Sequence, residues 1–205
     1  VMGHGGCGKT TLVEAIAYQT GITARMGKVT DGNTISDYDK EEQKRQFSIS
    51  TSVVPVEFED IKINFLDTPG YFDFVGEVEE ACHAAGAAVI VINGKSGVEV
   101  GTLKAWELCE KYKLPRLFFV TGMDDDQASY RKIVLELNDR FGRKVAPFHV
   151  PIRENEKFVG FVNVVKMKGR RFINDTSEYE ECDIPDYMDK HLNISRDALV
   201  EAVAD

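Results

Sequence analysis

Eight residues near the start of the chain have the types and spacing of a phosphate-binding loop. They fit the pattern G-x-x-x-x-G-K-[ST] and are Gly3, His4, Gly5, Gly6, Cys7, Gly8, Lys9 and Thr10. Glycines allow the backbone to turn tightly, so that successive N–H groups point at one anion. Lys9 supplies a positive charge for the β- and γ-phosphates, and the Thr10 hydroxyl is placed for Mg²⁺. The loop therefore predicts a site for a nucleoside triphosphate and Mg²⁺, and Thr11 completes the expected set of contacts.

Two further segments carry groups that such a site needs, and each directly follows an apolar strand pattern. In Asp67-Thr68-Pro69-Gly70, the Asp is placed to hold Mg²⁺ through water and the Gly to offer its N–H to the γ-phosphate. In Thr121-Gly122-Met123-Asp124, the last carboxylate can accept hydrogen bonds from the two N–H groups of guanine, where adenine presents an acceptor. The alternatives are a plain turn at the first segment and a helix cap at the second.

The elements that position these groups alternate between strand and helix. A helix is expected from Lys9 to about Gln19, a polar loop from Gly27 to Lys44, and strands at 48–58 and 61–66 with a turn at Glu59 and Asp60. Buried strands at 87–92 and 117–120 are each followed by a helix, at 103–112 and 127–141. This order predicts a three-layer α/β fold with a mostly parallel sheet. Only Val1 and Met2 precede the loop, so we expect the N-terminal strand to be mostly missing.

The pattern changes after residue 144, where alternating residues at 158–165 predict antiparallel strands and Ser195 is the expected N-cap of a helix at 195–204. We therefore predict two domains, at 1–144 and 145–205, the second being a small α+β unit. The basic run Lys166 to Arg171 suits either RNA phosphates and acidic ribosomal proteins or a solvated hairpin.

Composition narrows the class of protein. The 205 residues are 43% hydrophobic and 29% charged, as in an ordinary globular chain, and the net charge of -9 disfavours binding of bare nucleic acid by a broad basic face. The four cysteines form no C-x-x-C pair, which disfavours a zinc site and suits reduced thiols in the cytoplasm. No apolar run is long enough to span a membrane.

Taken together, these motifs resemble the GTPase domain of translational GTPases, most closely those of the elongation factor G type. The segments that carry the resemblance are 3–12, 27–32, 42–45, 61–74, 119–124 and, for an inserted subdomain, 158–167. The resemblance implies GTP or GDP with Mg²⁺, switch loops at about 27–50 and 67–80, a cytoplasmic monomer, and a ribosomal partner that stimulates hydrolysis. It also implies that Ser48 joins Thr10 and Asp67 as a metal ligand.

Several positions depart from the family pattern. The base motif, usually Asn-Lys-x-Asp, has Thr121 and Gly122 in its first two places, and Gly6 stands where the loop usually carries an Asp. Tyr71 occupies the place of the histidine that positions the attacking water, and a phenol is neutral near pH 7. In the first switch, Phe47 and Ser48 replace Ile and Thr. Groups that hold phosphate and Mg²⁺ are thus retained, whereas groups that drive hydrolysis or contact the base are altered.

We therefore predict a GTPase acting on the ribosome, with Lys9, Gly70 and Tyr71 as its catalytic residues. The alternative is a ribosome-binding, nucleotide-gated paralogue with slow or absent hydrolysis. A P-loop kinase or ATPase is less favoured, because Asp124 and the loop at 27–50 suit a GTPase better.

Overall fold

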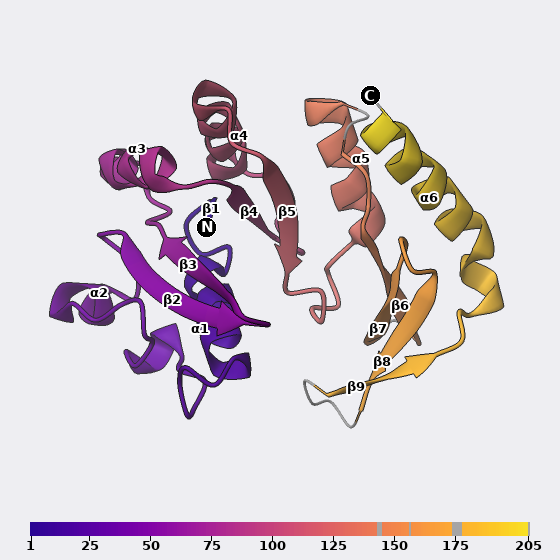
Figure 1. The fold of residues 1–205 in the computed structure, drawn as a ribbon, viewed down its shortest axis with the longest axis horizontal. Coiled ribbons are helices and arrows are strands. Elements are labelled where there is room, and N and C mark those ends of the chain that lie inside the picture. Colours follow the sequence, from indigo (N-terminus) through magenta and orange to yellow (C-terminus); the bar gives the residue numbers. More distant parts are fainter. Residues whose placement is uncertain (143–144, 156, 174–177, 205) are drawn as a thin grey trace. The chain divides into compact units, whose positions relative to one another are not determined.

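A short parallel sheet carries the phosphate-binding loop. β4 (Ala88–Asn93) is its central strand, between β1 (Met2–Gly3) and β5 (Arg116–Thr121), as Figure 1 shows for the computed structural model. The run Ala88 to Ile92 is entirely apolar, which is typical of a strand covered on both faces. Met2 pairs with Ile90, so the loop that follows β1 lies at the carboxyl ends of the strands. Ligands bind at that edge in α/β folds.

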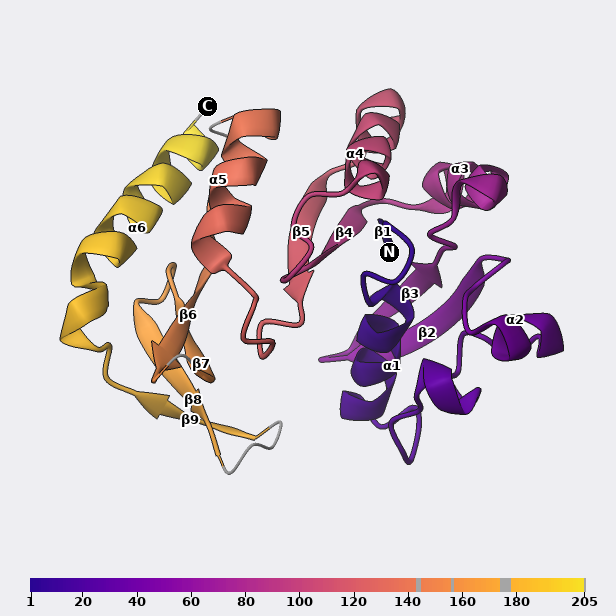
Figure 2. The same cartoon turned by 180° about the vertical axis from the view of Figure 1, so that it is seen from behind.

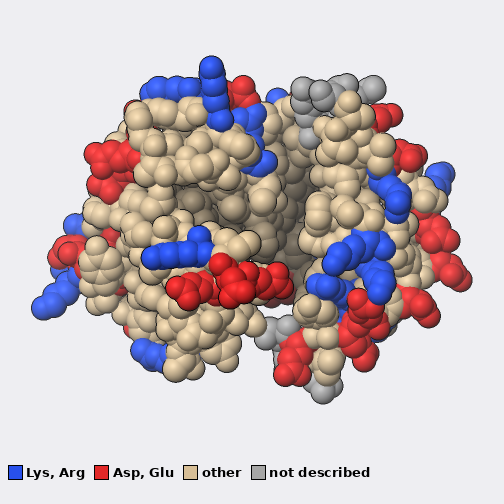
Figure 3. Space-filling view, viewed as in Figure 1, with Lys and Arg blue, Asp and Glu red and all other residues tan. Residues whose placement is uncertain are grey.

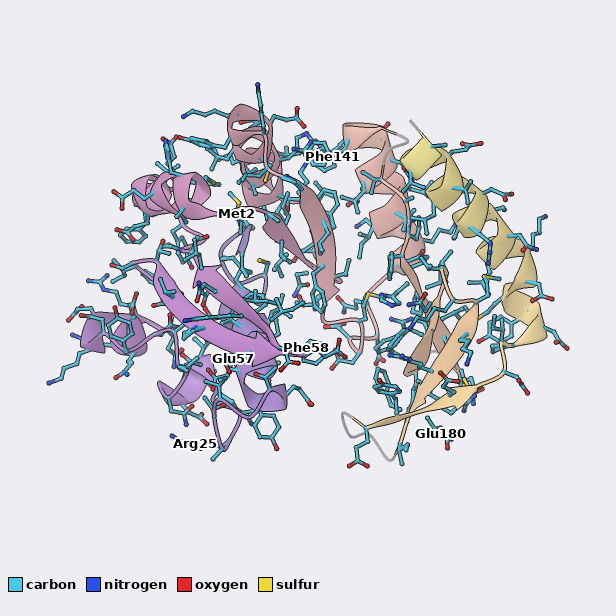
Figure 4. The ribbon with its side chains drawn as sticks, viewed as in Figure 1. Met2, Arg25, Glu57, Phe58, Phe141 and Glu180 are labelled. Atoms are coloured by element: carbon cyan, nitrogen blue, oxygen red, sulfur yellow. The ribbon has the colours of Figure 1, made fainter. Side chains whose placement is uncertain are left out.

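An antiparallel hairpin adjoins β1. Its strands are β2 (Ser52–Phe58) and β3 (Ile61–Asp67), and Figure 4 shows Glu57 and Phe58 near its tip. The turn residues Glu59 and Asp60 have φ of 48° and 63°, the left-handed values of a two-residue hairpin loop. The Val1 amine donates to the Leu66 carbonyl at 2.6 Å, and the Thr68 N–H donates to the Val1 carbonyl at 3.3 Å. This is the hydrogen-bond pattern of a parallel pair, so β3 continues the strand layer beside β1.

Helices cover both sides of these strands (Figures 1 and 2). α3 (Val75–Ala84) and α4 (Val100–Tyr112) lie on one side, where Met2, Ile90 and Cys109 are core residues. α1 (Lys9–Gln19) lies on the other side, and its Val13 and Ala17 pack against Val54 and Val56. The predicted α/β fold is confirmed, and α1 has the predicted bounds. The helix α3 was not predicted from the sequence, and its signal is the spacing of Val75, Val78, Ala81 and Cys82.

The stretch at 27–44 was expected to be a loop without regular structure, and this expectation was wrong. It contains a 3-10 turn, η1 (Val29–Asp31), and α2 (Lys40–Arg45). Asp39 and Glu42 form a capping box, in which the side chain of each residue accepts a hydrogen bond from the backbone N–H of the other. This capping box starts α2. β2 begins at Ser52 rather than at 48, because side-chain carboxylates bind the N–H groups of Ile49, Ser50 and Thr51.

The structure describes residues 1–142, 145–155, 157–173 and 178–204, and the chain divides into two units at Thr121–Gly122. The second unit has the sheet order β6-β7-β8-β9, antiparallel throughout, from β6 (His149–Glu154), β7 (Lys157–Asn163), β8 (Lys168–Phe172) and β9 (Tyr179–Cys182). It also contains α5 (Tyr130–Phe141), η3 (Asp186–Met188) and α6 (Asp189–Ala204). The packing boundary precedes the expected one at 144, a residue outside the described ranges. The reason is that Tyr130 of α5 packs on the core of Ile152, Val162 and Leu192. The boundary between GTPase domain and inserted subdomain stays a prediction.

Ser195 is not a helix N-cap, because it lies inside α6, which begins at Asp189. Met188 and Leu192 are buried in the core of the second unit, so the apolar face of this segment starts before Ser195. An acidic residue in the first turn, Asp189, also favours the earlier start.

Two of the four basic residues at 166–171, Lys168 and Arg171, form ion pairs with acidic side chains. The Lys168 ammonium lies 2.7 Å from a Glu181 oxygen, and Arg171 donates to Glu154 at 3.1 Å. The partner cations lower the pKa of both carboxyls. The Arg170 guanidinium stacks over the Tyr179 ring at 4.4 Å. Figure 3 shows Lys and Arg beside Asp and Glu on this unit, which favours the solvated hairpin. Across the described ranges, the helices are too short or too polar to cross a membrane.

Candidate nucleotide-binding site

At two positions in the loop between β1 and α1, the backbone has a conformation that only glycine adopts readily. Gly6 and Gly8 have φ of 77° and 96°. A Cβ on Gly8 would also lie 3.2 Å from the Thr121 side chain, and one on Gly3 would lie 2.5 Å from the Val91 carbonyl oxygen. The glycine spacing seen in the sequence is therefore required by both conformation and close packing.

Lys9 is 6% exposed and its ammonium lies within the loop. Its Nζ donates to the carbonyl oxygens of His4 at 2.9 Å and Gly3 at 3.3 Å. Gly70 follows the carboxyl end of β3 and lies directly against the Lys9 ammonium. A Cβ on Gly70 would overlap the Lys9 Nζ and lie 2.8 Å from the backbone nitrogen of Gly5. The structure thus brings together Lys9 and Gly70, each of which the sequence assigned to the phosphates of a nucleotide.

A cluster of buried oxygen atoms lies beside Thr10. Its Oγ1 is 3.2 Å from the Ser48 Oγ, and Ser48 in turn donates to Asp37 Oδ1 at 2.7 Å. Asp67 is 1% exposed, and within the described residues neither of its carboxylate oxygens has a hydrogen-bond partner. The same is true of Ser36 Oγ and Asp37 Oδ2. We call Thr10, Ser36, Asp37, Ser48 and Asp67 the oxygen cluster.

The electrostatics of the oxygen cluster suit a hard cation. Burial raises the pKa of Asp67, and the nearby hydroxyls of Thr10 and Ser36 oppose this only in part, since neither makes a hydrogen bond of normal geometry to it. Burial also raises the pKa of Asp37, against the hydrogen bond from Ser48. Buried carboxylate oxygens without partners are costly unless a positive charge compensates them. Hydroxyl and carboxylate oxygens are the donors that Mg²⁺ prefers, so these residues fit that ion.

Two buried carboxylates that hold the first switch loop, those of Glu14 and Glu42, were not predicted from the sequence. Glu14 is 2% exposed, and its two oxygens accept from the Gly27 N–H at 2.8 Å and the Ile35 N–H at 2.7 Å. Glu42 Oε1 accepts from the N–H groups of Ile49 at 2.8 Å and Ser50 at 3.0 Å. A signal was present for Glu14, which shares one helix face with Thr10, Val13 and Ala17 at i, i+3, i+4 and i+7 spacing. The spacing of Asp39 and Glu42 is the signature of a capping box and indicates a helix start, whereas Asp37 had no such signal.

His4 connects the phosphate-binding loop to the start of α4. Its Nδ1 accepts from the Gly101 N–H at 3.2 Å, which leaves the proton on Nε2, 3.6 Å from a Glu99 oxygen. A Cβ on Gly101 would lie 2.8 Å from the backbone nitrogen of His4, so this contact needs glycine. Cys7 is 1% exposed and burial raises the pKa of its thiol, which suits a packed loop residue rather than a reactive one.

The remaining predicted site residues lie in different places. Thr121 reaches the loop, where its Oγ1 donates to the Cys7 carbonyl at 2.7 Å. Thr11 follows Thr10 on an exposed face of α1. Tyr71 lies against Gly5. Gly122 and Asp124 belong to the second unit, and their contact with a base stays a prediction.

A buried lysine inside a glycine loop, between a parallel strand and a helix, defines the class of this domain. It is a P-loop domain of the α/β fold. The sequence profile of the elongation factor Tu GTP-binding domain matches residues 1–203, and the chain belongs to this family.

Individual relatives agree with this assignment. Elongation factor G from Chlamydia caviae is 35% identical over 206 residues, which cover 100% of this chain and 30% of that protein. A crystal structure of a protein from Thermus thermophilus superposes with a TM-score of 0.92 at 36% identity, over 98% of this chain and 30% of that one. A bacterial selenocysteine-specific elongation factor matches at TM-score 0.53 and 20% identity, over 68% of this chain and 23% of that one, and shows the fold alone. The predicted resemblance to the elongation factor G type is confirmed. The chain spans 30% of the length of elongation factor G from Chlamydia caviae.

Proposed function

We propose that this chain is the GTP-binding part of a translation factor of the elongation factor G type, and that it couples GTP binding and hydrolysis to action on the ribosome. The observation that carries the proposal is the oxygen cluster. It joins Thr10 of the phosphate-binding loop to Ser48 of the first switch loop, and it includes Asp67 at the start of the second. Three segments that meet at one candidate cation site are what a nucleotide-dependent switch requires.

Each residue has a proposed role in this activity. Lys9 would exchange its carbonyl partners for phosphate oxygens, and the Gly70 N–H would donate to the terminal phosphate. Thr10 and Ser48 would bind Mg²⁺ directly, and Asp67 would bind it through water. When bound, Mg²⁺ neutralises charge on the phosphate oxygens. Tyr71 would orient the attacking water through its hydroxyl, without a positive charge.

Nucleotide competition tests the base site. We expect GTP to compete at least about tenfold better than ATP, because the Asp124 carboxylate accepts from two guanine N–H groups and repels the adenine acceptor. Asp124→Asn should shift the preference from GTP to XTP, since xanthine offers one donor and one acceptor at that edge. Asp126→Asn, two residues away, is the control and should change nothing. Equal affinity of the parent for ATP and GTP would remove Asp124 from its proposed role.

A second candidate function is a nucleotide-gated ribosome-binding protein that hydrolyses GTP slowly. Tyr71 favours it, because that position carries a phenol in place of an imidazole, and the phenol ring packs against Phe47. Multiple-turnover phosphate release by the whole protein, with and without ribosomes, distinguishes the two functions. We expect ribosomes to stimulate release and Tyr71→His to raise the rate further. A protein that binds ribosomes without stimulation supports the second function, and a Tyr71→His variant no faster than the parent shows that Tyr71 does not limit the rate.

A further inference from the structure

Aromatic side chains from both switch loops meet above the phosphate-binding loop. The rings of Phe47 and Tyr71 have centroids 4.7 Å apart and planes inclined at 58°, and Phe74 lies 6.5 Å from Phe47. Tilted rings at these distances attract each other beyond their buried area. Phe47 belongs to the first loop and Tyr71 to the second, so this contact joins them.

The Tyr71 ring is seated on Gly5 of the phosphate-binding loop. A Cβ on Gly5 would lie 3.3 Å from the Tyr71 Cζ and 3.4 Å from its Cε atoms. This is tighter than ordinary contact, so a larger side chain on Gly5 would displace the ring. The ring therefore depends on a glycine whose backbone lies at the proposed phosphate site.

Each ring is next in sequence to a residue of the proposed nucleotide site. Phe47 directly precedes Ser48, whose hydroxyl lies 3.2 Å from Thr10. Tyr71 directly follows Gly70, which lies against Lys9. Because adjacent residues share a peptide unit, the position of each ring limits the position of its neighbour.

We propose that Phe47 and Tyr71, seated on Gly5, form an aromatic latch that closes the two switch loops over the phosphate-binding loop and positions Ser48 and Gly70. The Tyr71 ring supplies the latch, whereas its hydroxyl supplies the water contact proposed above. Phe47 and Gly5 are thus positioning residues. The meaning of the latch for GTP rests on the proposed function, but the latch itself is measurable without nucleotide.

Hydrogen exchange of the unliganded chain tests the latch. Phe47→Ala should raise exchange about tenfold at 70–74 as well as in its own loop, and Tyr71→Ala should do the same at 47–51, given the strength of an aromatic pair together with its buried area. Tyr71→Phe keeps the ring and should exchange as the parent does. Tyr38→Ala removes an aromatic side chain that is 72% exposed in the first loop, and is the matched control. Loosening confined to the mutated loop, or a Tyr71→Phe variant that behaves like Tyr71→Ala, would overturn the latch.

A second variant keeps both aromatic side chains and changes only the glycine that the Tyr71 ring contacts. Gly5→Val should displace the Tyr71 ring and raise exchange in both loops, with the helix content by circular dichroism unchanged. Unchanged hydrogen exchange at 47–51 and 70–74 in this variant would contradict the proposal that the Tyr71 ring packs on Gly5. Dissociation of a fluorescent GTP analogue should be about tenfold faster from Phe47→Ala than from the parent or from Tyr71→Phe. If the parent binds no GTP analogue, the proposed function fails, while the exchange result still decides whether the latch exists.

Discussion

Replacing Asp67 by asparagine is expected to stabilise the metal-free chain and to weaken its Mg²⁺-dependent binding of nucleotide. Asp67 is 1% exposed, and neither of its oxygens has a hydrogen-bond partner within the described residues. An amide of the same shape avoids burying a charge without a partner, so the free energy of unfolding should rise by about 1–3 kcal/mol. Loss of a carboxylate that orients metal-bound water should lower the affinity for Mg²⁺ about 10- to 100-fold.

Urea unfolding with EDTA measures the first effect, and nucleotide affinity as a function of Mg²⁺ concentration measures the second. Asp60→Asn is the matched control, because Asp60 lies in the exposed turn at the other end of β3, at a φ of 63° that asparagine tolerates. Its stability and Mg²⁺ dependence should match the parent. If Asp67→Asn destabilised the metal-free chain, the carboxylate would be making compensating contacts, and its assignment to the cation site would be wrong.

The same carboxyl predicts how stability changes with pH. Burial raises the pKa of Asp67 above its ordinary value of 3.8, so the folded chain keeps this proton at pH values where the unfolded chain has lost it. Stability of the metal-free chain should therefore fall as the pH rises from about 4 through the raised pKa. The decline should be shallower in Asp67→Asn, and the part that remains is expected from Asp37, whose pKa is raised in the same direction.

Glu14→Ala is expected to have the largest effect on stability. The two oxygens of Glu14 accept from the N–H groups of Gly27, which is buried, and Ile35, which is partly buried, and the Glu14 side chain is 2% exposed. Alanine would leave both donors without a partner, so the free energy of unfolding should fall by about 2–5 kcal/mol. Glu14→Gln keeps one acceptor but points an amide N–H₂ at the other donor. Its free energy of unfolding should therefore lie between those of Glu14→Ala and the parent.

Urea unfolding and hydrogen exchange at Gly27 and Ile35 together measure this effect. The local amides should exchange faster even under conditions where the whole chain remains folded, because the first switch loop would lose its attachment to α1. Glu107→Ala, at an exposed position of α4, is the control and should change stability by less than about 0.5 kcal/mol. A Glu14→Ala variant as stable as Glu107→Ala would show that the loop is held by other contacts.

The sequence by itself determined the parts of this protein that depend on neighbouring residues. The glycine loop and α1 were predicted with their observed bounds, because glycine spacing and helical periodicity act within a few residues. The strands β4 and β5 were found from short apolar runs for the same reason, and β3 from a segment with apolar residues at 61, 63, 65 and 66. Lys9, Thr10 and Gly70 were chosen from motifs and Ser48 from the family resemblance, and the structure places Lys9 beside Gly70 and Thr10 beside Ser48.

Only the tertiary structure decided which polar residues are buried and what they contact. Asp37 looks like an ordinary charged residue in the sequence, and the local patterns around Glu14 and Glu42 do not name their partners. Each is buried because another segment folds over it and offers it backbone or hydroxyl donors. The start of α6 before Ser195 and the contact of Phe47 with Tyr71 likewise depend on packing between residues far apart in the chain. Burial is a property of the whole fold, so local pattern cannot supply it.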